Sequence, residues 1–91
     1  MQINWAAMGE VDAAAAGVVV ARLAEIARRA NGLRRVSFID RTRGCAPEVK
    51  LATSFARGSL GVVRTGETRE AALLATVDGL ECLLRSRSSA D

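Results

Sequence analysis

The sequence predicts an α+β sandwich in which two helices pack on one face of a four-stranded mixed sheet. Two segments repeat their apolar residues with a helical period, and four shorter segments alternate polar and apolar residues as strands do. Their order along 91 residues is β-α-β-β-β-α. A chain this short buries only roughly 60–65% of its unfolded surface, so it has one thin core and little room for an enclosed active site. We expect a single domain over residues 1–87 and a frayed tail over residues 88–91.

The first strand is expected over residues 1–5, where polar and apolar side chains alternate. Ile3 and Trp5 then share one face of the strand. Trp5 is the only tryptophan of the chain and could serve as a base-stacking platform, but its register with Ile3 favours a place in the core.

The first helix is expected over residues 12–30. Asp12 is a suitable N-cap, and Asn31 with Gly32 suits a helix end because both tolerate a left-handed backbone. The apolar stripe consists of Ala16, Val19, Val20, Leu23, Ile26, Ala27 and Ala30, and the opposite side carries Arg22, Glu25 and Arg29.

Three strands follow, over residues 33–40, 49–56 and 60–65. The short glycine-containing segment 57–59 predicts a tight hairpin between the last two strands. Residues 41–47 form a loop with turn residues and two arginines. The side chains expected on the core face are Val36, Phe38, Val49, Leu51, Thr53, Phe55, Leu60 and Val62.

The second helix is expected over residues 68–87. Thr68 is a suitable N-cap, and Glu70 places a favourable negative charge in the first turn. Gly79 lies in the middle of the helix, at a cost of about 1 kcal/mol relative to alanine. The apolar stripe is Leu73, Val77, Leu80 and Leu84.

The charge is basic, with a net value of +3 and a pI of about 9.7. Lysine and arginine together number 13, and all but Lys50 are arginine. This bias is explained equally well by a GC-rich genome or by function. Arginine is always charged and presents a fork of donors that suits phosphate groups.

Several function classes are excluded or disfavoured. The chain has no histidine, so a Ser-His-Asp or Cys-His arrangement is excluded, and the carboxylates form no close pair for acid–base catalysis. Cys45 and Cys82 lack metal-ligand spacing. Free thiols are the expectation, with a disulfide left open and a thiol sensor as a third functional reading. We expect no enzyme activity, no metal and no cofactor.

A membrane or secreted protein is also disfavoured. The longest apolar run, residues 13–21, is far shorter than the ~20 residues that a membrane span needs. Glu10 and Asp12 precede this run, where a signal peptide carries basic residues. We therefore expect a cytoplasmic protein.

Short patterns along the chain resemble the ribosome hibernation promoting factor family, also described as ribosome-associated inhibitor or sigma-54 modulation proteins. Met-Gln-Ile-Asn at residues 1–4 resembles the first strand of the family, and Val-Ala-Arg-Leu-Ala-Glu-Ile at residues 20–26 its first helix. Arg-Gly-Ser-Leu at residues 57–60 resembles its β3–β4 turn. Residues 66–72 and 77–81 resemble the entry and the centre of its last helix. The order and spacing of these pieces carry the resemblance.

The resemblance implies a β-α-β-β-β-α fold and a non-enzymatic role. Such proteins bind the small ribosomal subunit in the cleft that mRNA and tRNA occupy, where they block translation and protect idle ribosomes. The basic residues that it carries over are Arg22, Arg28, Arg29, Arg85 and Arg87. Arginines around the second strand could extend this surface into one positive margin. The expected rRNA-binding residues are Arg22, Arg28, Arg29, Arg35, Arg41, Arg43, Arg85 and Arg87.

Departures from the family keep an alternative open. Gly79 stands where the family usually has a basic residue, and another is often found near Cys82, so the affinity for rRNA should be weaker. The dimerisation extension of long family members is not in this sequence, and we do not expect the chain alone to pair ribosomes. The alternative is a protein-interaction or homodimerisation module with a weakly polar patch at Gly79, Cys82 and Leu83. The arginines of the first helix would then be an ordinary solvated face, paired with Glu25.

Overall fold

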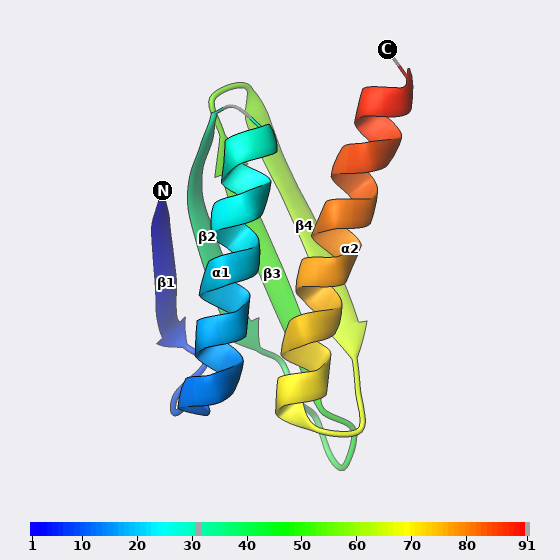
Figure 1. The fold of residues 1–91 in the computed structure, drawn as a ribbon. Helices are drawn as coiled ribbons and strands as arrows, with labels where there is room; N and C mark the ends of the chain where they lie inside the picture. Colours follow the sequence, from blue (N-terminus) through cyan, green and yellow to red (C-terminus); the bar gives the residue numbers. More distant parts are fainter. Residues whose placement is uncertain (31, 91) are drawn as a thin grey trace.

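The fold is the predicted two-layer sandwich. A computed structural model describes the backbone of residues 1–30 and 32–90 and the side chains of residues 1–30 and 32–86. The two helices lie side by side on one face of a four-stranded sheet (Figure 1). In chain order the elements are β1 (Gln2–Ala7), α1 (Ala13–Arg29), β2 (Leu33–Asp40), β3 (Glu48–Phe55), β4 (Gly58–Thr65) and α2 (Arg69–Ala90).

The sheet has the strand order β1-β2-β3-β4. β1 pairs with β2 in parallel, because α1 returns the chain to the same end of the sheet, and the other two pairings are antiparallel. Regular pairing of β3 with β4 starts at Phe55 opposite Gly58 and runs to Glu48 opposite Thr65. β1 and β4 are therefore the edge strands.

Both helices begin as the sequence predicts. The Asp12 carboxylate accepts a hydrogen bond from the backbone N–H of Ala15 over 3.1 Å, and the Thr68 hydroxyl accepts one from Ala71 over 3.0 Å. Each bond satisfies a donor that the first turn leaves without a helical partner. α2 continues to Ala90, past the expected end at residue 87. The single domain over residues 1–87 and the frayed tail over residues 88–91 stay predictions.

Gly32 lies in the turn that follows α1. The other predicted cap residue, Asn31, lies outside the described residues. Gly32 has a φ of +93°, which disfavours any residue with a Cβ. A Cβ there would also come within 3.3 Å of the Cβ of Ala56. The Gly32 carbonyl accepts a hydrogen bond from the Ala56 N–H over 3.0 Å, which joins the start of β2 to the β3–β4 turn. That turn consists of residues 56–57, so β4 begins two residues before the predicted strand.

The core lies between the helices and the sheet. Its largest fully buried side chains include Phe38, Leu23, Leu51, Leu73 and Leu80. The predicted alternation of β3 is confirmed, because Val49, Leu51 and Thr53 are buried and Phe55 is half-buried on the same face. Trp5 packs against this core as predicted, with its ring stacked on Phe38 at a centroid distance of 4.8 Å and an interplanar angle of 18°.

The predicted helix faces are wrong at Val20 and at Gly79. Val20 was placed in the buried stripe of α1, yet it is 44% exposed. Gly79 was placed on the exposed side of α2, yet it is buried against β4, where an added Cβ would lie 2.7 Å from Val62 Cγ1 and 3.0 Å from Arg64 Nη2. The absence of a side chain at Gly79 therefore allows α2 to approach the sheet closely and does not remove a charge from the exposed surface.

Candidate nucleic-acid interface

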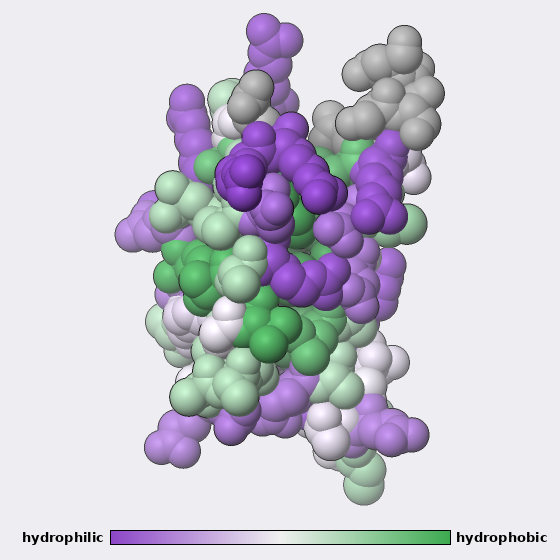
Figure 2. Space-filling view, viewed as in Figure 1, coloured by the Kyte–Doolittle hydropathy of each residue, from purple (hydrophilic) through white to green (hydrophobic). Residues whose placement is uncertain are grey.

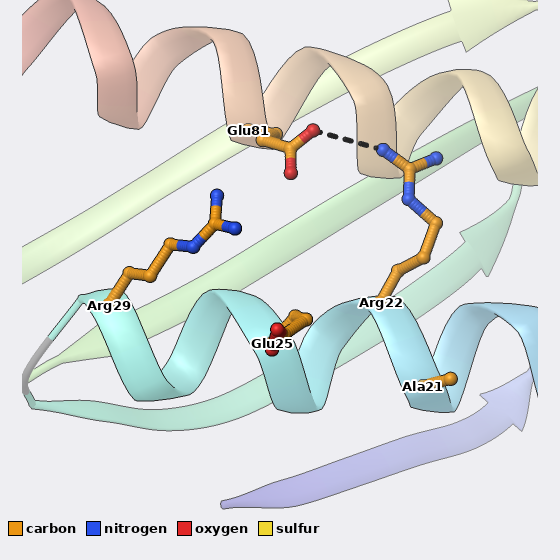
Figure 3. A pocket seen from close by; sticks show the side chains of 5 residues that line it. All are labelled: Ala21, Arg22, Glu25, Arg29 and Glu81. Atoms are coloured by element: carbon orange, nitrogen blue, oxygen red, sulfur yellow. Dashed lines mark hydrogen bonds and ion pairs between the residues drawn. The ribbon is translucent and has the colours of Figure 1, made fainter.

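The groove between the helices holds ion pairs in place of a row of free arginines. The sequence predicts Arg22 on the outer side of α1. In the structure its side chain reaches across to α2 instead. Its Nη2 donates to Glu81 Oε2 over 3.2 Å (Figure 3). Its Nη1 pairs with Asp78 Oδ1. Arg22 therefore joins the two helices to each other.

These carboxylates also fix the charge of Arg22. The hydrogen bond to Asp78 raises the pKa of the Arg22 guanidinium above its ordinary value, and the nearby charges of Asp78 and Glu81 act in the same direction against the opposing effect of burial. Arg22 is thus permanently charged and already neutralised within the molecule. A phosphate would have to compete with two carboxylates for it.

Arg29 lies in the same groove. The groove contains a pocket lined by Ala21, Arg22, Glu25, Arg29 and Glu81. Figure 3 shows Arg22 and Arg29 extending from α1 toward α2 on either side of Glu81. Within the described residues no ion pair involves Arg29. Its guanidinium is available to an anion that approaches the helix ends.

The other predicted helix arginines differ in their surroundings. Arg28 is exposed and pairs with Glu25 over 3.1 Å within α1. Arg85 pairs with Glu81 over 3.7 Å, so Glu81 serves two arginines. The side chain of Arg87 lies outside the described residues.

Five arginines gather at one end of the sandwich, where α1 ends, β2 begins and the β3–β4 turn lies (Figure 1). Arg28 and Arg29 come from the last turn of α1, and Arg34, Arg35 and Arg57 from the two strand junctions that the Gly32–Ala56 hydrogen bond ties together. We call these five residues the basic end. All five are exposed, and hydrophilic side chains project from this part of the surface in Figure 2.

Arg41 and Arg43 do not belong to this group. They lie in the loop between β2 and β3, at the opposite end of the eight-residue strand β2. The predicted continuous positive margin is therefore not formed. The acidic residues at this opposite end are Glu10, Asp12, Asp40, Glu48, Glu67 and Glu70.

Arg69 at the opposite end acts as a structural tie. Its Nη1 donates to the Met8 carbonyl over 2.9 Å and lies 3.6 Å from Asp40 Oδ2. It thereby links the loop before α1, the end of β2 and the start of α2. Hydrogen bonds from Thr42, followed by the charge of Arg69, hold the pKa of the Asp40 carboxyl below its ordinary value of 3.8.

Arg57 and Arg34 complete the basic end but are absent from the predicted binding set. Arg57 was assigned to the hairpin turn alone. Its position at the basic end could have been predicted from the order of the strands. A parallel β1–β2 pair joined by a helix places the end of that helix beside the start of the second strand. The β3–β4 turn then lies at the same end, since β3 runs antiparallel to β2.

Other chemistry has little support in the described part of the chain. Cys45 and Cys82 are both free and exposed, as expected. No cluster of three or more His, Cys, Asp or Glu side chains among the described residues could hold a metal ion. Neither described helix has the length and apolar character that crossing a bilayer requires.

Comparison with known proteins identifies the fold. No protein-family model matches the sequence, and no curated protein matches it. Among solved structures, a ribosomal subunit interface protein from Coxiella burnetii superimposes over 100% of both chains with a TM-score of 0.79 and 13% identity. The N-terminal domain of Thermus thermophilus Protein Y superimposes over 93% of both chains with a TM-score of 0.71 and 18% identity. The chain thus has the fold of these two proteins, in agreement with the resemblance that its sequence patterns suggested.

Proposed function

We propose that this protein is a non-catalytic, ribosome-associated factor that binds phosphates of small-subunit rRNA and thereby inhibits or modulates translation in the cytoplasm. The observation that carries the proposal is the basic end, where five exposed arginines lie at the same end of the sandwich. The shared fold with a ribosomal subunit interface protein supports the same role. The resemblance of the sequence to hibernation factors points in the same direction.

The chemistry of the basic end suits backbone recognition. Guanidinium groups form paired hydrogen bonds with phosphate oxygens and require no particular base. Trp5, Phe38 and Phe55, which are all the aromatic residues, pack against or within the core. Stacking on unpaired bases therefore has no platform, and the shape and charge of folded rRNA would be recognised.

The groove between the helices plays a secondary part in this proposal. Arg22 and Arg85 share the carboxylate of Glu81, so their net contribution to phosphate binding is reduced. Arg29 links the groove to the basic end. Once bound, a rigid sandwich 40 Å long would exclude mRNA or tRNA by occupying their space.

The test is co-sedimentation of the protein with purified 30S subunits and 70S ribosomes across a salt series. Saturable binding that falls steeply with salt is expected, because each phosphate neutralised contributes about 0.7–0.9 to the slope of log K against log salt. The double substitution Arg28→Glu with Arg29→Glu should abolish binding while circular dichroism remains unchanged.

The matched control is Arg41→Glu with Arg43→Glu, which makes the same change of charge at the opposite end of the sheet. We expect this pair to retain most of the binding. Equal losses from both pairs would mean that net charge alone matters and would contradict the assigned surface. Absence of binding at low salt would favour the alternative, an interaction module that uses this fold without the ribosome.

A further inference from the structure

The outer face of the first half of α1 is apolar and exposed. Residues 13–21 contain no polar side chain. Val18 and Val20 are 48% and 44% exposed, although valine is usually buried. Figure 2 shows this hydrophobic surface below the charged side chains at the end of the helix. The exposed members, which we call the apolar α1 face, are Ala13, Ala14, Gly17, Val18, Val20, Ala21 and Ala24.

Gly17 lies at the centre of this face, and no close contact within the chain requires a glycine there. Glycine in a helix interior is destabilising relative to alanine. At Gly79 the close approach of β4 accounts for the glycine, but a Cβ at Gly17 would meet nothing within 4 Å. Gly17 and Ala21 lie one turn apart, so the helix backbone is bare at this point. Such a surface permits the close approach of another helix.

The two ends of the apolar α1 face carry opposite charges. Glu10 and Asp12 are exposed before the helix begins, and Arg28 and Arg29 are exposed in its last turn. A second α1 helix laid antiparallel on the first would place the acidic end of each against the basic end of the other. A parallel arrangement would place like charges together.

We infer that the apolar α1 face is the contact surface of a two-fold symmetric homodimer in which the α1 helices pack antiparallel. With the axis at the height of Val19, Gly17 lies opposite the partner's Ala21, and the exposed Val18 and Val20 flank this contact on either side of the helix. The same register places Glu10 near the partner's Arg28. Every contact occurs twice because the interface is isologous.

The size of the face predicts a weak dimer. From Ala13 to Ala24 the helix is about 18 Å long, so the contact buries less than the roughly 800 Å² per partner of a stable interface. The dimer therefore forms at high protein concentration, with a dissociation constant between about 10 μM and 1 mM. The inference does not depend on ribosome binding, although the dimer would occupy Arg28 and Arg29 and so compete with rRNA.

Sedimentation equilibrium of the purified protein from about 10 μM to 1 mM tests the inference. The mass should rise from that of the 9.6 kDa chain toward twice that value. Ala21→Glu should weaken the dimer by about tenfold or more, because it buries an unpaired carboxylate. A monomer at all concentrations would overturn the inference.

The matched control is Leu83→Glu, which places a carboxylate at a comparably exposed apolar position of α2. This variant should dimerise as the parent does. A dimer that Leu83→Glu disrupts and Ala21→Glu leaves intact would move the interface to α2 and overturn the assignment to α1.

A charge exchange tests the register. Glu10→Arg and Arg28→Glu should each weaken the dimer, and the double variant should recover it because both pairs are restored with reversed polarity. Additive losses in the double variant would contradict the antiparallel arrangement. Circular dichroism of each variant checks that the fold is retained.

Discussion

Arg22 of α1 donates a hydrogen bond to Glu81 of α2 over 3.2 Å, and the same guanidinium pairs with Asp78 one turn earlier. This contact joins the two helices across their groove. We predict that Arg22→Ala lowers the free energy of unfolding by about 1 kcal/mol, since it removes two charge-assisted bonds, of which the one to Glu81 is partly buried. Urea denaturation measures the change. Arg28→Ala is the comparison, because its exposed pair with Glu25 is worth only about 0.2–0.5 kcal/mol, and equal effects would argue against the joining role of Arg22.

Gly17 and Gly79 both lie within helices, but we predict opposite effects when each becomes alanine. Gly17→Ala should raise the free energy of unfolding by about 0.5–1 kcal/mol, because the added methyl meets no atom of the chain. Gly79→Ala should lower it by about 1–3 kcal/mol, because the methyl would overlap with Val62. Urea denaturation at low micromolar concentration, where the monomer prevails, checks both. A stabilising Gly79→Ala would show that α2 can move away from β4 without cost.

The carboxyl of Asp40 should contribute to acid sensitivity. Its pKa is lowered in the folded protein, so the stabilisation is fully present above the unfolded value of about 3.8 and is lost as the pH falls through the lower folded value. Asp40→Asn should therefore be slightly less stable at pH 7, by less than about 1 kcal/mol, and should lose less stability than the parent below pH 3.8. Thermal denaturation between pH 7 and pH 2 measures both effects. Parallel curves for the two proteins would contradict the role of the Thr42 and Arg69 contacts.

Arg57 provides a test of the basic end at a residue outside the predicted binding set. If Arg57 contacts a phosphate, Arg57→Gln should reduce the slope of log K against log salt for 30S binding by about 0.7–0.9. Arg43→Gln, which makes the same change at the opposite end, should leave the slope unchanged. A slope that Arg57→Gln does not alter would remove this residue from the surface.

The order of the elements and most of the core could be predicted because they depend on local patterns. The alternation of β3 identified Val49, Leu51 and Thr53 as buried, and the caps at Asp12 and Thr68 were found from residue type alone. These features depend on neighbours within a few residues, which the sequence shows directly.

The faces of the helices could not be predicted with the same success. Residues 13–21 are uniformly apolar, so the period that separates a buried from an exposed side is absent and Val20 was misplaced. The environments of Arg22 and Gly79 depend on contacts with residues far along the chain, namely Glu81 and Val62. The assembly of the basic end likewise required the strand order and could not follow from spacing.

The stack of Trp5 on Phe38 has a practical consequence for following how the molecule opens. Trp5 is the only tryptophan and the chain has no tyrosine, so nearly all of its ultraviolet emission arises at one edge of the sheet. β1 is an edge strand whose only neighbour in the sheet is β2, so it can detach while the helices remain packed. Emission from the indole would then report the loss of β1, and circular dichroism would report the helices. Midpoints that differ between the two signals would reveal that the first strand leaves the sheet before the rest unfolds.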